Sequence, residues 1–127
     1  MSEENLKHHE ISYIELSVTD MHTAQQFYGS AFGWEFTDYA PVYAGIKKLS
    51  GEGESGGLSL VDRVESGGPL VLLYSADLEA SLDSVKKAGG TIVQDVMSYP
   101  GGRRFHFSDP SGNTLGVFTT AGGDPLP

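Results

Sequence analysis

The sequence predicts an α+β fold of two modules, each with one strand, one helix and three further strands, and three observations lead to this prediction. Residues 103–119 alternate as two strands around the turn 109–113 (DPSGN). A strand, an aspartate helix cap and a glycine stop follow one another twice along the chain. The two caps, Asp20 and Asp77, are 57 residues apart, and this offset aligns both halves without a gap. Two units of the same βαβββ order are the economical description.

The strands of the hairpin 103–119 separate their side chains onto two faces, because successive side chains point to opposite sides of a strand. Pro110 presets φ for the turn, while Gly112 and Asn113 tolerate a positive φ. The apolar set is Phe105, Phe107, Leu115 and Val117, and the mixed set is Arg104, His106, Gly116 and Phe118. We expect the apolar set in the core and the mixed set on a solvent-facing or ligand-facing surface.

The first module is predicted from about residue 10 to residue 62. Its opening strand alternates Ile14, Leu16 and Val18 with Tyr13, Glu15 and Ser17. Asp20 caps a helix whose apolar positions recur at helical spacing until Gly33 stops it. Further strands are expected around Trp34, Phe36 and Tyr39, over 42–49 and over 58–61, with a flexible loop at 50–57.

Residues 62–69 (DRVESGGP) have the composition of a linker to the second module, predicted at about 70–120. That module repeats the order, with a strand at 70–74, a helix after Asp77, a stop at Gly89-Gly90 and a strand at 91–97. The domain therefore covers 10–120, between a flexible leader (1–9) and an irregular tail (121–127).

The composition narrows the classes of partner. A chain of 127 residues suits one compact domain, and its net charge of −9 argues against nucleic acid. The absence of cysteine excludes disulfides and thiolate metal sites, and it fits a cytoplasmic location. No signal peptide and no apolar run of membrane-spanning length is present, so no membrane partner is expected.

Two segments resemble the vicinal oxygen chelate (VOC) superfamily, also called the glyoxalase/bleomycin resistance/dioxygenase superfamily. They are YIELSVTDMHTAQQFYGSAFGWEF (13–36) and FSDPSGNTLGVF (107–118). Phe27-Tyr28 and Gly33-Trp34 resemble its glyoxalase-like subgroup in particular. The resemblance implies paired βαβββ modules that form a curled mixed sheet around a cleft. We also expect a homodimer, because edge strands are exposed and dimers are usual in similar proteins.

The resemblance also implies where metal-dependent members hold a divalent ion. Each module supplies one side chain from its first strand and one from its last, usually His, Glu or Gln. The matching positions here are Tyr13, Ser59, Leu70 and Gly116, with Ser59 placed by the 57-residue offset. None of them is a good ligand for a divalent ion at neutral pH. We therefore predict no metal and no cofactor at the usual site.

Other side chains on the expected cleft faces are suited to a small organic ligand. The predicted ligand-binding residues are Tyr13, Tyr43, Tyr74, Arg104 and Phe118. Arg104 can hold a carboxylate or phosphate through paired hydrogen bonds, or it can form a salt bridge with Glu15 or another acidic residue. His106 and Glu15 are the candidate catalytic residues, with His106 as a general acid or base near pH 7.

These residues leave the class of function open. The first hypothesis is a protein that binds a small organic ligand in the cleft without the usual metal site. The alternative is a lyase-type or isomerase-type enzyme that acts on a small oxygenated molecule through Glu15, His106 and Arg104. Such an enzyme could also hold a divalent metal through unusual ligands, for example His106 with Glu15.

Overall fold

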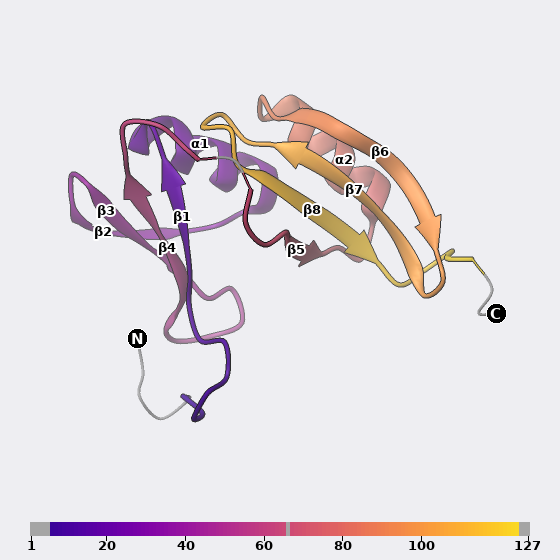
Figure 1. Ribbon diagram of the computed structural model, residues 1–127, viewed down its shortest axis with the longest axis horizontal. Helices are drawn as coiled ribbons and strands as arrows, with labels where there is room; N and C mark the ends of the chain where they lie inside the picture. Colours follow the sequence, from indigo (N-terminus) through magenta and orange to yellow (C-terminus); the bar gives the residue numbers. More distant parts are fainter. Residues whose placement is uncertain (1–5, 66, 125–127) are drawn as a thin grey trace.

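The computed structural model describes residues 6–65 and 67–124 and confirms the predicted fold of two βαβββ modules (Figure 1). The first module contains β1 (Ile14–Val18), α1 (Met21–Phe32), β2 (Phe36–Ala40), β3 (Tyr43–Lys47) and β4 (Glu54–Leu60). The second contains β5 (Val71–Tyr74), α2 (Leu78–Lys87), β6 (Thr91–Tyr99), β7 (Gly102–Ser108) and β8 (Thr114–Thr119). Part of the predicted leader (1–5) and part of the tail (125–127) lie outside the described residues.

Each module forms its own four-stranded mixed sheet. The first sheet has the order β1-β4-β3-β2, and the second has the order β5-β8-β7-β6. In both, the first strand pairs in parallel with the last strand, and the remaining pairs are antiparallel. The connecting helix makes this parallel pairing possible, and it leaves β1 and β5 as edge strands.

Both helices begin at the predicted caps. The Asp20 carboxylate accepts from the backbone N–H of Thr23, and Asp77 accepts in the same way from Ala80. Helix α1 ends at Gly33, whose φ of 74° is in the left-handed region that glycine adopts without strain. In the described part of the chain, neither helix has the length and apolar character needed to cross a bilayer.

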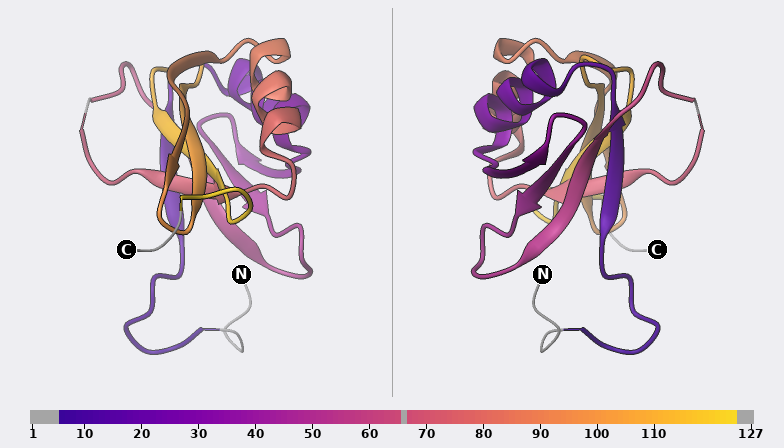
Figure 2. Two further views of the ribbon diagram at one scale, coloured as in Figure 1. Left: turned by 90° about the vertical axis from the view of Figure 1, so that its right-hand side faces the viewer. Right: turned by 90° about the vertical axis from the view of Figure 1, so that its left-hand side faces the viewer.

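Both modules contribute to one hydrophobic core. Its members come from both helices and from one face of each sheet, and include Leu16, Leu58, Phe27, Val85, Phe107 and Val117. The helices lie side by side (Figure 2), and the rings of Phe27 on α1 and Phe107 on β7 are 5.8 Å apart. Helix α1 therefore packs against the second module as well as its own. The opposite face of each sheet, its outer face, points away from this shared core.

The loop predicted over 50–57 was wrong for its second half, because residues 50–53 form a turn but β4 begins at Glu54 rather than Leu58. Glu54 pairs with Lys47 on β3, and Gly56 pairs with Ile14 on β1. A Cβ atom at Gly56 would lie 1.9 Å from the carbonyl oxygen of Ile14. The glycines that suggested a loop instead permit close approach between strands.

Candidate functional site

The outer face of the second sheet brings together the predicted residues of that module. Arg104 on β7 lies opposite Phe118 on β8, which lies opposite Tyr74 on β5. Two residues further along β7, His106 lies opposite Gly116 on β8, which lies opposite Leu72 on β5. Residues directly opposite one another in a sheet share a face. We call Leu72, Tyr74, Arg104, His106 and Phe118 the arginine face.

Arg104 carries an unpaired donor on this face. Its guanidinium carbon lies 5.4 Å from the centre of the Tyr99 ring, a cation–π geometry. Its Nε atom is buried and has no hydrogen-bond partner. Within residues 6–65 and 67–124, Arg104 forms no salt bridge, so the alternative pairing with Glu15 is not made. A buried N–H without an acceptor is unfavourable, which makes it a recognition point for a ligand oxygen.

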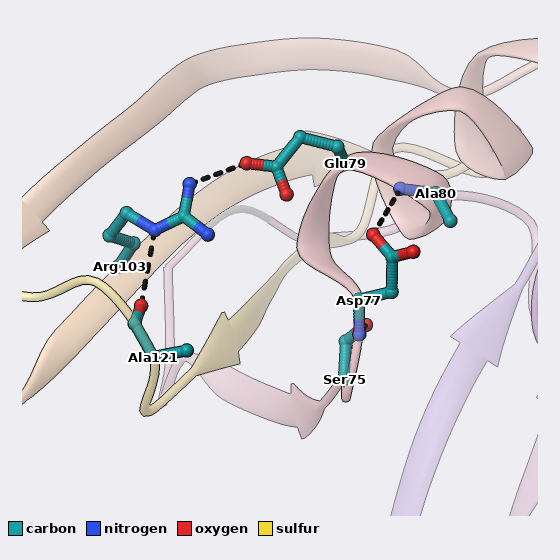
Figure 3. Close-up of polar contacts among 6 residues, drawn as sticks. All are labelled: Ser75, Asp77, Glu79, Ala80, Arg103 and Ala121. Carbon is teal, nitrogen blue, oxygen red and sulfur yellow. Dashed lines mark hydrogen bonds and ion pairs between the residues drawn. The ribbon is translucent and has the colours of Figure 1, made fainter.

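The neighbouring Arg103 contacts the protein through two of its three guanidinium nitrogen atoms (Figure 3). Its Nη1 contacts Glu79 on α2 at 2.5 Å, and its Nε donates to the carbonyl oxygen of Ala121 at 3.2 Å. The hydrogen bond from Arg103 lowers the pKa of Glu79, and the same bond raises the pKa of Arg103. Arg103 therefore joins the chain after β8 to α2, whereas Arg104 is available for another partner.

His106 lies against Gly116 and Leu72. A Cβ atom at Gly116 would lie 2.4 Å from Leu72 Cδ2 and 3.1 Å from His106 Cδ2, so the glycine makes room for both side chains. The Nε2 atom of His106 is buried without a partner. Burial and the nearby positive charge of Arg104 lower the pKa of His106 from 6.5. The imidazole is therefore neutral at pH 7.

We expect an NMR titration to give His106 a pKa below 6.5, and Arg104→Gln to raise it toward that value. At pH values between the lowered pKa of His106 in the folded protein and its pKa of 6.5 in the unfolded chain, the unfolded chain binds more protons than the folded protein. The contribution of His106 to the free energy of unfolding is therefore complete above pH 6.5 and declines as the pH falls through the folded pKa. Comparing urea unfolding of the wild type and His106→Gln across this range measures the effect. A His106 pKa above 6.5 would contradict it.

The outer face of the first sheet is rich in tyrosine and glutamate. We call Tyr13, Glu15, Tyr39, Tyr43 and Glu54 the tyrosine face. The hydroxyls of Tyr13 and Tyr43 are hydrogen-bonded to each other, and the Tyr39 hydroxyl donates to Glu54. Burial, followed by hydrogen bonding to Tyr13 and Glu15, raises the pKa of Tyr43. Two of the predicted ligand-binding residues and the predicted Glu15 therefore lie in one connected group.

The strand register changes one of the four positions at which the family holds a metal. Gly116 lies opposite Leu72, and the corresponding residue of β1 is Glu15, which lies opposite Gly57. The equivalent of Gly116 is therefore Gly57, and the placement at Ser59 was wrong because the offset drifts by two residues before the last strand. The space above Gly57 is taken by the hydroxyls of Tyr43 and Tyr13.

The residues at these positions, Tyr13, Gly57, Leu70 and Gly116, do not fit a divalent ion. Two glycines and a leucine offer no side-chain ligand, and the Tyr13 hydroxyl is already bonded to Tyr43. Among residues 6–65 and 67–124, no three His, Asp or Glu side chains are grouped so that they could hold a metal.

The structure does not bring Glu15 and His106 together within one chain. Glu15 belongs to the first sheet and His106 to the second, and each outer face points away from the shared core. In the described residues, no side-chain hydrogen bond joins the tyrosine face to the arginine face. Sequence reasoning did not identify Tyr99, Tyr39 or Glu54 as parts of these faces. Alternation along β2 could have indicated Tyr39, whereas Glu54 was hidden in the expected loop.

Paired βαβββ modules, each with its last strand parallel to its first, define the fold of the VOC proteins. The chain belongs to the Glyoxalase/Bleomycin resistance protein/Dioxygenase superfamily, whose family model matches residues 10–117. A glyoxylase-like domain-containing protein from Didymella fabae is 32% identical over an alignment that covers 91% of this chain and 97% of that protein.

Solved structures agree on the fold. A glyoxalase-related enzyme from Fulvimarina pelagi has a TM-score of 0.74 at 20% identity, covering 93% of this chain and 97% of its own. TnmS3, an antibiotic binding protein from Streptomyces sp. CB03234, has a TM-score of 0.65 at 24% identity, covering 88% of this chain and 96% of its own. The same fold therefore occurs in an enzyme and in a binding protein.

Proposed function

We propose that this protein binds a small organic ligand through a carboxylate or similar oxygen group placed against the arginine face, without a metal at the usual family positions. The observation that carries the proposal is the pair of buried nitrogen atoms, Arg104 Nε and His106 Nε2, that have no hydrogen-bond partner. Native proteins pair almost all such atoms, so a ligand oxygen is the natural missing partner.

The rest of the arginine face suits an aromatic or apolar ligand body. The rings of Tyr74 and Phe118 meet edge to face with centres 5.6 Å apart, and Leu72 is 37% exposed. A fixed guanidinium beside apolar walls orients an anionic group while the walls bury the remainder of the molecule. The antibiotic binding protein TnmS3 supports a binding role on this fold.

Three further parts of the proposal concern assembly, location and chemistry. A homodimer is supported by the exposed edge strands β1 and β5. A cytoplasmic location is supported by the absence of cysteine.

The enzyme alternative needs Glu15 beside His106, and within one chain the two lie on separate sheets.

The test uses benzoate as the anionic probe and benzamide as its neutral counterpart, with binding measured by calorimetry and NMR. We expect Arg104→Gln to weaken benzoate binding at least tenfold, since it removes a charge-assisted hydrogen bond. Arg63→Gln is the matched control, because Arg63 is exposed and its salt bridge with Glu65 lies in the linker. Equal benzoate affinity in the wild type and Arg104→Gln would rule out the arginine face as the site.

A further inference from the structure

A cavity on the first sheet lies outside the site proposed above. Its volume is about 510 Å³, and its lining includes Glu35, Thr37, Tyr39, Lys47 and Glu54. Tyr39 and Glu54, which are hydrogen-bonded to each other, belong both to the lining of this cavity and to the tyrosine face. Neither residue has a role in the binding at Arg104.

Two of the three tyrosine hydroxyls on the tyrosine face donate hydrogen bonds within that face. The Tyr39 hydroxyl donates to Glu54, and one of the Tyr13 and Tyr43 hydroxyls donates to the other. Glu15 lies near this pair, and its negative charge contributes to the raised pKa of Tyr43. Carboxylates accept hydrogen bonds and donate none. The lone pairs left over on this face therefore suit a ligand that supplies donors.

Glu54 is the buried acceptor of this group. The residue is only 9% exposed, and in the described residues its Oε2 accepts from Tyr39 while its Oε1 receives no hydrogen bond. Gly45 makes this position possible, because a Cβ atom there would lie 2.0 Å from Glu54 Oε2. Glu54 Oε1 is not among the buried side-chain atoms that lack a partner, so it is accessible to a charged donor from outside.

In the part of the chain that the structure describes, no lysine or arginine side chain forms a salt bridge with Glu54. Lys47, which lies opposite Glu54 in the strand pairing, and Lys48 both line the same cavity, and both are exposed. Within residues 6–65 and 67–124, the salt bridges are Arg63–Glu65 and Arg103–Glu79, and neither includes Glu54. The net charge of −9 adds a general attraction for cations.

We propose that this cavity is a second binding site, which takes the planar amidinium or guanidinium group of a small organic cation. The N–H groups of the cation donate to Glu54 Oε1 and to the free lone pair of the Tyr39 hydroxyl. The Tyr39 ring, 60% exposed, provides a surface on which the planar cation stacks. The site recognises positive charge, in contrast to the arginine face.

Benzamidine tests the proposal, because it has the ring of benzoate and benzamide with a positive group. We expect benzamidine to bind the wild type at least tenfold more tightly than benzamide, and to shift the NMR signals of Thr37, Tyr39 and Gly45. Glu54→Gln keeps an acceptor for Tyr39 and removes the charge, so it should weaken benzamidine binding at least tenfold. Asp83→Asn, an exposed change on α2, is the charge-matched control and should leave the affinity unchanged.

Two results would overturn this site. One is the absence of benzamidine binding to the wild type at millimolar concentration, and the other is equal affinity in a folded Glu54→Gln variant. NMR mapping on the wild type keeps the test decisive if Glu54→Gln fails to fold, since shifts confined to other elements also contradict it. Arg104→Gln should leave benzamidine binding intact, so failure at one face is distinguishable from failure at the other.

Discussion

We expect Asp109→Ala to lower the free energy of unfolding by about 3–5 kcal/mol, because it leaves several buried donors without an acceptor. Asp109 is 5% exposed. Its Oδ1 accepts from the backbone N–H groups of Ser111 and Asn113, both at 2.9 Å. Its Oδ2 accepts from the Tyr28 hydroxyl at 2.7 Å and from Asn113 Nδ2 at 3.0 Å. The same Asn113 amide donates to the carbonyl oxygen of Ser17, so the loss also loosens the contact between modules.

Urea unfolding followed by circular dichroism measures this change. Tyr28→Phe removes one of the donors and should cost about 1–2 kcal/mol, with a double variant less destabilised than the sum of the two. Asp83→Ala is the matched control, since Asp83 is exposed on α2 and should change stability by less than about 0.5 kcal/mol. A loss below about 1 kcal/mol for Asp109→Ala would mean that the turn does not organise the junction.

The second large effect is expected for Gly56→Ala, which should lower the free energy of unfolding by about 2–3 kcal/mol. The added methyl group would meet the carbonyl oxygen of Ile14 at 1.9 Å, and a backbone atom cannot turn aside as a flexible side chain can. Strand β1 must therefore move away from β4. Because β1 carries Glu15 and follows Tyr13, the tyrosine face should lose its Tyr13–Tyr43 hydrogen bond as well.

Hydrogen exchange of the β1 amides separates this local effect from general destabilisation. We expect the amides over Ile14–Val18 to lose protection first in Gly56→Ala, while those of the second sheet keep theirs. Ser55→Ala, one residue earlier and exposed, should leave both the exchange pattern and the stability unchanged. Wild-type protection across β1 in the Gly56→Ala variant would show that the strands accommodate the methyl group.

Alternation and capping were sufficient to predict which face of each hairpin strand enters the core. Phe105 and Phe107 are fully buried, while Arg104 and His106, which alternate with them, lie on the outer face. The period of two along a strand and the N-cap role of Asp20 and Asp77 are local properties, so the sequence reveals them directly. The glycines of 51–57 were misleading, since glycine has the same local signal in a loop and in a tight strand contact.

The sequence by itself determined the paired βαβββ order, the faces of most strands and the absence of good metal ligands at the expected positions. Only the tertiary structure decided that Gly57 and not Ser59 matches Gly116, that Glu54 is buried beneath Tyr39, and that Glu15 and His106 belong to separate faces. The physical reason is that these features depend on register between distant strands and on how the two sheets pack around shared helices. Neither the register between distant strands nor the packing of the sheets can be read from a short stretch of sequence.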